Sequence, residues 1–197
     1  MDGPAGRTTA PAPPQRCRDR AERRALIERA LALGVPDDYG RARGLRLQRE
    51  PARLVSIGSD IRGREQWLQP RAALALGRMR EAALRDGVEL QVVSAFRSIE
   101  YQLGILERKL AHGQTMDEVL RISAAPGYSE HHTGRCVDLT TPDCTALEEE
   151  FERSPAFAWL ERNAAGFGFT LSYPRENRHG IVYEPWHWCW HARMSRR

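Results

Sequence analysis

Two short segments of the sequence carry the side chains that a catalytic metal site requires. The first holds His131 and Asp138 on either side of a glycine turn, and the second holds Glu184 and His187 around a proline and a tryptophan. A catalytic zinc ion takes three protein ligands from His and Asp or Glu and leaves a fourth position for water. The sequence therefore predicts that His131, Asp138 and His187 bind zinc.

Glu184 is left over from this ligand set and lies three residues before His187. A carboxylate close to a metal-bound water is suited to act as general base, so we assign that role to Glu184. Taken singly, each residue has a plainer interpretation: His131 caps a turn, Asp138 ends a strand, and Glu184 is a surface acid. The two segments complete one site together, and this favours the metal interpretation.

Arg97 is the candidate for stabilising negative charge on the substrate. It lies between a predicted buried strand, residues 88–96, and a predicted helix that Ser98 caps. A guanidinium group at such a corner offers a rigid fork of donors to an oxyanion or a carboxylate. The alternative is a surface arginine paired with an acid. Gln102, one turn into the helix, either orients the substrate or is solvated.

Three segments of the sequence also resemble a known family, in the family's order: residues 94–98, residues 129–138 and residues 184–187. They are similar to the VanY-type zinc D-alanyl-D-alanine carboxypeptidases and D,D-dipeptidases, and the similarity extends over about residues 54–191. It implies an enzyme that uses Zn²⁺ to hydrolyse a short D-amino-acid peptide or peptidoglycan and releases terminal D-alanine.

The resemblance also implies residue roles. His131, Asp138 and His187 match the family's zinc ligands, Glu184 its base, and Arg97 the arginine at the reacting carbonyl oxygen. Ser129 matches a serine that helps to hold the substrate.

The cysteines are expected to be reduced thiols. Cys136 and Cys144 are close enough in sequence for a disulfide to remain an option, whereas the absence of CxxC spacing makes a cysteine-rich zinc site a poor interpretation. Cys136 stands where the resembled family usually has alanine. It is expected to face the metal cavity without being a ligand, and Cys189 follows the last ligand closely.

The hydrophobic pattern predicts an α+β fold, with a small antiparallel sheet, packed helices and a zinc cleft on one face. We expect the strands of this sheet near Val93, Val137, Ile181 and Trp188. Helices are predicted over the following ranges: 19–33, 70–85, 98–110, 115–124 and 154–166. A further strand is predicted at 54–57 and another at 167–173.

The last strand has two chemically distinct faces. Alternation places Trp186, Trp188 and Trp190 on one face and His187 on the other, together with Cys189 and His191. Tryptophans in this pattern usually belong to the core. Trp186 is nevertheless a candidate lining residue for the substrate pocket, because it lies between the proposed base and a ligand.

Length and composition indicate a globular protein with an arm. We expect residues 1–18 to form a disordered Pro/Arg-rich arm, 19–53 a helix and loop, and 54–197 the peptidase domain. The net charge of +4 does not call for a nucleic-acid partner. We expect a monomer that does not span a membrane. Without a signal-peptide pattern the protein is expected in the cytoplasm, with the periplasm or cell envelope as the alternative that its resemblance favours.

Three other functions remain open at this point. A peptidoglycan endopeptidase would use the same zinc site in a cleft open at both ends. A zinc-bearing binding module would have no need of Glu184. A structural zinc site would use Cys189 and His191 together with His187.

Overall fold

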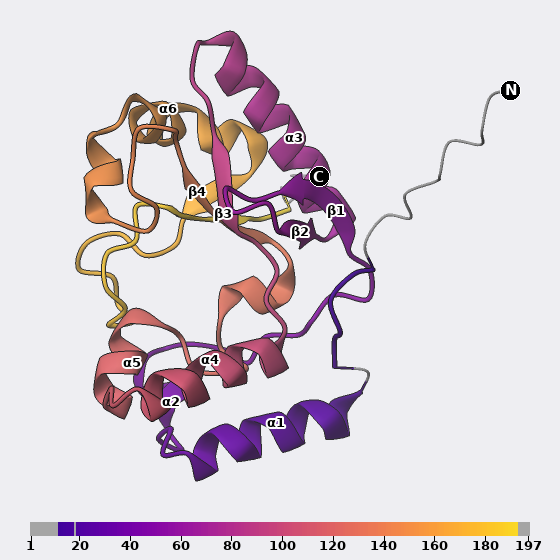
Figure 1. The fold of residues 1–197 in the computed structure, drawn as a ribbon, viewed down its shortest axis with the longest axis vertical. Coiled ribbons are helices and arrows are strands. Elements are labelled where there is room, and N and C mark those ends of the chain that lie inside the picture. Colours follow the sequence, from indigo (N-terminus) through magenta and orange to yellow (C-terminus); the bar gives the residue numbers. More distant parts are fainter. Residues whose placement is uncertain (1–11, 18, 193–197) are drawn as a thin grey trace, which may run out of the picture.

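The protein is an α+β domain built around a four-stranded antiparallel sheet, seen in a computed structural model that describes residues 12–17 and 19–192 (Figure 1). The order of the strands is β3-β4-β6-β5, and a separate hairpin is formed by β1 and β2. The strands are β1 Val55–Ser59, β2 Glu65–Leu68, β3 Gln91–Ser94, β4 Cys136–Thr140, β5 Phe169–Leu171 and β6 His187–Trp190. The predicted fold class is confirmed.

The α-helices are α1 Arg20–Ala32, α2 Tyr39–Ala42, α3 Pro70–Arg85, α4 Ile99–Ala111, α5 Met116–Ile122 and α6 Pro155–Asn163. Short 3-10 helices are η1 Glu130–Thr133, η2 Glu149–Arg153 and η3 Ala164–Phe167. Ser98 caps α4 by accepting a hydrogen bond from Tyr101 N at 3.0 Å, as its sequence position predicts. Helix α3 begins at Pro70, where a proline costs no intrahelical hydrogen bond.

Two hydrophobic clusters hold the fold together. One joins the sheet to α3 and α6 through side chains such as Leu76, Leu139 and Leu160. The other joins α1 to α4 and α5 through side chains such as Ala30 and Leu103. Figure 1 shows these groups in the upper and lower halves of the molecule, and η1 and the loops beside β4 and β6 connect them.

One predicted strand is wrong. Residues 180–183 form no strand in the described structure, and the edge of the sheet next to β6 is taken by β5. The backbone near Ile181 has other partners, since the Asn177 side chain donates to Ile181 O at 2.7 Å and Val182 N donates to Arg121 O at 3.2 Å. These bonds tie the segment to a turn and to the end of α5, which brings it to the wall of the site.

Other boundaries differ from the sequence prediction by less. The strand predicted over residues 88–96 is reduced to β3, and neither α2 nor β2 was predicted. Residues 1–11 and 18 of the predicted arm lie outside the described residues. Residues 12–17 form neither helix nor strand, and Cys17 N donates to the Glu50 carboxylate at 2.6 Å. Among the described residues, no helix is both long and apolar enough to cross a membrane.

Candidate active site

The three predicted zinc ligands meet in one place. Asp138 lies on β4 and is paired in register with His187 at the start of β6. His131 comes from η1, which Gly134 ends in the left-handed conformation, with φ of 61°. This turn reverses the chain between His131 and β4, and only glycine adopts it without strain. The local sequence therefore brings His131 and Asp138 together, and strand pairing adds His187.

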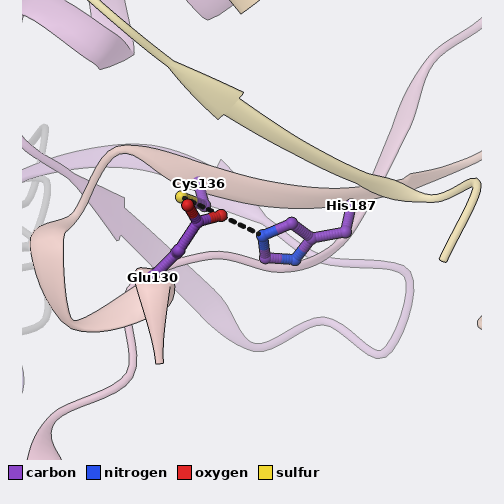
Figure 2. Close-up of side chains that lie close together, drawn as sticks. All are labelled: Glu130, Cys136 and His187. Carbon is purple, nitrogen blue, oxygen red and sulfur yellow. Dashed lines mark hydrogen bonds and ion pairs between the residues drawn. The ribbon is translucent and has the colours of Figure 1, made fainter. Parts of the chain in front are cut away.

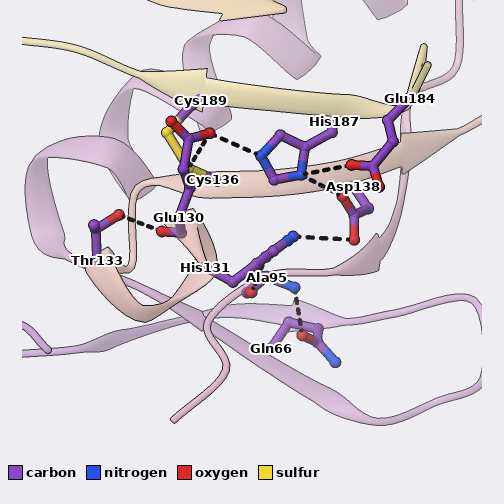
Figure 3. Close-up of polar contacts among 10 residues, drawn as sticks. All are labelled: Gln66, Ala95, Glu130, His131, Thr133, Cys136, Asp138, Glu184, His187 and Cys189. Carbon is purple, nitrogen blue, oxygen red and sulfur yellow. Dashed lines mark hydrogen bonds and ion pairs between the residues drawn. A yellow bond between two sulfur atoms is a disulfide. The ribbon is translucent and has the colours of Figure 1, made fainter. Parts of the chain in front are cut away.

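Asp138 lies between the two imidazoles (Figure 3). Its Oδ2 is 3.2 Å from His131 Nε2, and its Oδ1 is 3.0 Å from His187 Nδ1. One ligand atom from each residue lies within 4.8 Å of the other two. Ligands about 2.0–2.2 Å from a shared tetrahedral ion would be ~3.5 Å apart, so small movements bring the three atoms to a metal.

The tautomer of His131 suits a metal ligand. Its Nδ1 donates to the carbonyl oxygen of Ala95 at 2.5 Å, which leaves Nε2 with a free lone pair. Nε2 is buried and has no hydrogen-bond partner among the described residues, because its contact with Asp138 lacks hydrogen-bond geometry. Burial, and then the charge of Arg97, lower the pKa of His131 to about 4, so the ring is neutral at pH 7. A buried imidazole nitrogen without a partner fits a metal ion.

His187 carries a proton in the absence of metal. Burial alone would lower its pKa, but hydrogen bonds and charge from Asp138 and Glu130 outweigh burial and raise the pKa to about 10. Burial likewise opposes ionisation of Asp138, yet its place between the two imidazoles, with a hydrogen bond and a positive charge from His187, holds its pKa below the ordinary value. The site thus has a surplus of negative charge, which one proton partly compensates and a divalent cation would compensate better.

Glu130 is a residue that the sequence analysis missed. Its Oε2 lies 3.1 Å from His187 Nε2 (Figure 2), whereas Asp138 contacts the other ring nitrogen, Nδ1 (Figure 3). Burial would raise the pKa of Glu130, but the hydrogen bond and charge of His187 lower it to about 2. A carboxylate in this position orients a ligand imidazole and fixes which nitrogen faces the metal. Its position directly before His131 was the only signal available.

Gln66 is a second residue that the sequence did not reveal. Its Oε1 accepts from Ala95 N at 2.9 Å, while the carbonyl of Ala95 accepts from His131 (Figure 3). Gln66 Nε2 in turn donates to Asp60 at 2.9 Å. The β1–β2 hairpin therefore anchors the backbone that orients His131.

Glu184 lies on the other side of His187. Its Oε2 is 3.7 Å from His187 Nδ1, and 13% of its side chain is exposed. Burial raises the pKa of Glu184 to about 7, against the opposing charge of His187. A carboxyl group with a pKa near neutrality is well matched to accepting and returning a proton. Tyr173, whose ring centroid is 4.9 Å from that of His187, packs beside it and was also missed.

Arg97 enters the same cavity from the β3–α4 corner. The cavity has a volume of about 370 Å³, and the predicted site residues that line it are Arg97, Gln102, Ser129, His131, Asp138, Glu184, Trp186 and His187. Arg97 Nε is buried and has no hydrogen-bond partner among the described residues. Gln102 donates to Ala124 O at 3.0 Å and leaves its Oε1 free of described partners. The cavity is thus lined both by the predicted zinc ligands and by residues with unused polar atoms.

His132, which follows His131 and is not a predicted ligand, supports the backbone of the site. His132 Nδ1 donates to the Arg97 carbonyl at 2.7 Å, and its Nε2 accepts from Gly127 N at 3.1 Å. Both ring nitrogens are therefore used. Burial lowers the pKa of His132 to about 3, in agreement with a neutral structural role.

The expectation of reduced cysteines is wrong for two of the four. Cys136 and Cys189 form a disulfide, while Cys17 and Cys144 are free. Cys136 and Cys189 are directly opposite in the β4–β6 register, so their side chains meet although 53 residues separate them in sequence. The option of a Cys136–Cys144 pair is also excluded.

The disulfide changes the interpretation of the sulfur atoms. Cys136 Sγ is 3.8 Å from Glu130 Oε2, and the two residues form a possible metal-binding group with His187 (Figure 2). A disulfide sulfur has neither a proton to donate nor a thiolate to offer, so this group is a packing contact. For the same reason, a structural zinc site that uses Cys189 is excluded.

Comparison with known proteins identifies relatives for most of this chain. The family model VanY, described as D-alanyl-D-alanine carboxypeptidase, matches residues 65–193. The Bacillus subtilis (strain 168) protein YodJ is 33% identical over 172 residues, which cover 83% of this chain and 58% of YodJ. A D-alanyl-D-alanine carboxypeptidase of Enterococcus faecalis is 33% identical over 118 residues, which cover 55% of this chain and 42% of that protein. The chain thus spans about half the length of these relatives.

Solved structures agree with this assignment. The LdcB LD-carboxypeptidase superposes with a TM-score of 0.65 at 30% identity, covering 73% of this chain and 70% of that one. A VanY D,D-pentapeptidase in complex with Zn(II) superposes with a TM-score of 0.57 at 28% identity, covering 74% of this chain and 84% of that one. VanYB in complex with D-alanine-D-alanine superposes with the same TM-score and identity, covering 74% of this chain and 81% of that one. With a family match over most of its length and this fold, the chain belongs to the VanY family of D-alanyl-D-alanine carboxypeptidases.

Proposed function

We propose that this protein is a zinc-dependent carboxypeptidase that removes the terminal D-alanine from peptides ending in D-alanyl-D-alanine. The observation that carries the proposal is the meeting of His131 Nε2, Asp138 and His187 Nδ1 in a cavity that also contains Glu184 and Arg97. Family membership and the Zn(II) complex of a relative support the choice of metal. The D-alanine-D-alanine complex of another relative supports the choice of substrate.

The proposed ligands are His131, Asp138 and His187. A bound zinc ion would polarise the scissile carbonyl and lower the pKa of a water molecule toward ~7. The remaining steps belong to side chains of this chain. Glu184 accepts the proton of the attacking water at its carboxylate and returns it to the leaving amine. Its raised pKa suits both transfers.

Arg97 stabilises the negative charge that develops on the carbonyl oxygen. Its Nε has no partner among the described residues, so the donor needs no rearrangement before it acts. Ser129, Gln102 and Trp186 line the same cavity and are proposed to hold the peptide. Ser129 and Gln102 are almost fully buried, which fixes their side chains before the substrate binds.

A second candidate substrate is a peptide whose terminal D-residue follows an L-residue. The observation in its favour is the likeness to the LdcB LD-carboxypeptidase, at a TM-score of 0.65. The two activities use the same ligands and base and differ in the configuration of the residue before the scissile bond.

The test is incubation of the zinc-loaded protein with three substrates and identification of products by mass. The substrates are a pentapeptide ending in D-Ala-D-Ala, a tetrapeptide ending in an L-residue followed by D-Ala, and intact peptidoglycan. We expect loss of one alanine from the pentapeptide. Cleavage of the tetrapeptide alone would favour the second candidate. Cleavage inside cross-linked peptidoglycan alone would favour an endopeptidase, and no cleavage at all would contradict the proposal.

A further inference from the structure

Lys109 is the only lysine in the sequence, in which the remaining 29 of 30 Lys and Arg residues are arginine. It lies on α4, and the face of α4 that carries Gln102, Ile105 and Lys109 lines the active-site cavity. These positions are three and four residues apart, so they lie along one side of the helix. Lys109 is seven residues after Gln102, so the two positions are ~10 Å apart along the helix at the cavity wall.

The ammonium group of Lys109 lacks an acidic partner. Lys109 is half-buried, and its Nζ donates to Ser123 Oγ at 3.1 Å. No carboxylate of the described residues lies within ion-pair distance of Lys109 Nζ. The ion pairs nearby, on α4 and in the cavity, are formed by other side chains. Burial, and then the charge of Arg97, lower the pKa of Lys109. A partly desolvated cation with one neutral partner gains free energy when an anion binds.

The acidic side chains that line the cavity lie next to His131 and His187, away from Lys109. Of the two acids that line the cavity, Asp138 contacts both histidines and Glu184 lies beside the ring of His187. Glu130, which is not part of the cavity lining, contacts His187 at the other ring nitrogen. Around Lys109 the cavity wall includes apolar side chains such as Ile105 and Ile122. Such surroundings strengthen a charge-assisted hydrogen bond to a ligand. The cavity therefore has an acidic, metal-binding end and a cationic end on α4.

We propose that Lys109 is a specificity residue that binds a carboxylate of the peptide substrate. The inference rests on the proposed function, and it leaves Arg97 free to act on the reacting carbonyl oxygen. A carboxylate in such a peptide has two sources: the terminal α-carboxylate of the leaving residue, or a side-chain carboxylate upstream of the scissile bond. The chemistry at Lys109 is the same for both, and the experiment separates them.

The kinetic test compares wild type with Lys109→Met, which keeps the length of the side chain and removes its charge. Three peptides ending in D-Ala-D-Ala are needed: one with both carboxylates, one amidated at the terminus, and one amidated at the upstream side chain. With the first peptide we expect KM to rise at least ~10-fold in Lys109→Met, the scale of a lost hydrogen bond to a charged group, while kcat stays within about twofold. Arg108→Met, an exposed neighbour outside the cavity, is the matched control and should leave KM unchanged.

The amidated peptides locate the contact. The peptide that lacks the carboxylate bound by Lys109 should have a raised KM with wild type and show no further loss with Lys109→Met, because both changes remove the same interaction. The other amidated peptide should show the full effect of the variant. An equal loss with both amidated peptides would indicate a packing role and overturn the proposal. A KM change below about twofold with every peptide would also overturn it.

A binding measurement tests the contact without turnover. The single lysine can be dimethylated with ¹³C-formaldehyde, which keeps its charge and leaves the α-amino group as the one other labelled site. In the Glu184→Gln protein, titration with the peptide bearing both carboxylates should shift the Lys109 methyl signal and leave the α-amino signal in place. An unmoved Lys109 signal, at a peptide concentration that calorimetry proves saturating, would overturn the proposal.

The two hypotheses can fail separately. If the wild type cleaves no D-alanine-terminated peptide, the proposed function is wrong, and the methyl signal still reports whether Lys109 binds a carboxylate. If the wild type cleaves the peptides and Lys109→Met does so with an unchanged KM, only the role of Lys109 is wrong.

Discussion

Glu130 Oε2 lies 3.1 Å from His187 Nε2, so a carboxylate holds the ring of a proposed zinc ligand from the side opposite the metal position. This contact determines that Nδ1 of His187 faces Asp138 and Glu184. Glu130→Gln retains the shape of the side chain but loses its charge. We expect zinc affinity to fall by about 10- to 100-fold with little change in the fold.

Competition with a chelator of known affinity measures this change. Glu81→Gln, which removes an exposed carboxylate of α3 far from the cavity lining, is the matched control and should bind zinc as the wild type does. Equal zinc affinity in Glu130→Gln and Glu81→Gln would show that Glu130 does not support the ligand.

The Cys136–Cys189 disulfide should contribute to stability more than to the choice of ligands. It closes a loop with a sequence separation of 53, and a loop of that size corresponds to about 4 kcal/mol of chain entropy in the unfolded state. The double variant Cys136→Ala/Cys189→Ala should therefore unfold at markedly lower denaturant concentration and still bind one zinc. Cys144→Ala, which changes a free cysteine, is the control. Identical unfolding midpoints for all three proteins would contradict the expectation.

Glu184→Gln should separate catalysis from metal binding. The amide cannot accept a proton, so turnover should fall by ~10² or more while zinc content stays at one per chain. Mass detection of released D-alanine and elemental analysis measure the two quantities. Turnover close to that of the wild type would remove Glu184 from the reaction.

The same variant makes a prediction about stability in the metal-free protein. Burial raises the pKa of Glu184 from 4.5 to about 7, so folding favours its protonated form. That contribution to stability is present in full below about pH 4.5 and is lost as the pH rises through about 7. In the metal-free proteins, the Tm of Glu184→Gln minus the Tm of the wild type should therefore be larger at pH 8 than at pH 4.5. A Tm difference that does not depend on pH would argue against the raised pKa.

Arg97→Ala should lower kcat and kcat/KM together by roughly 10²–10³, because the lost donors act mainly in the transition state. Arg97→Lys retains the charge without the planar fork and should recover only part of the rate. Steady-state kinetics on a D-Ala-D-Ala peptide provides the measurement. A rise in KM at constant kcat would instead indicate that Arg97 binds a carboxylate of the substrate, which is the role proposed for Lys109.

That the three proposed ligands and Glu184 lie together could be predicted from sequence, because the four residues come from two local segments. His131 and Asp138 flank one glycine turn, and Glu184 and His187 are three residues apart, so short spacings bring their types together. Helices α3 and α4 could be predicted for a similar reason, since their apolar stripes and their first residues follow helical rules.

What the sequence did not predict depends on register or on distant contacts. Cys136 meets Cys189 only because β4 and β6 pair with those residues opposite, and no local pattern specifies that alignment. Gln66 reaches Ala95 across 29 positions, from a short strand that was not predicted. The segment around Ile181 has an apolar pattern typical of a strand, yet the side chain of Asn177 and the end of α5 provide its partners.

The most direct test of the account is the position of the metal in crystals grown with zinc, located by anomalous scattering at the zinc absorption edge. We predict one peak at about 2.0–2.2 Å from His131 Nε2, an Asp138 carboxylate oxygen and His187 Nδ1, with Glu184 beside it and outside the ligand set. A peak bound through His187 Nε2 and Glu130, or the absence of any peak in this cavity, would contradict the account.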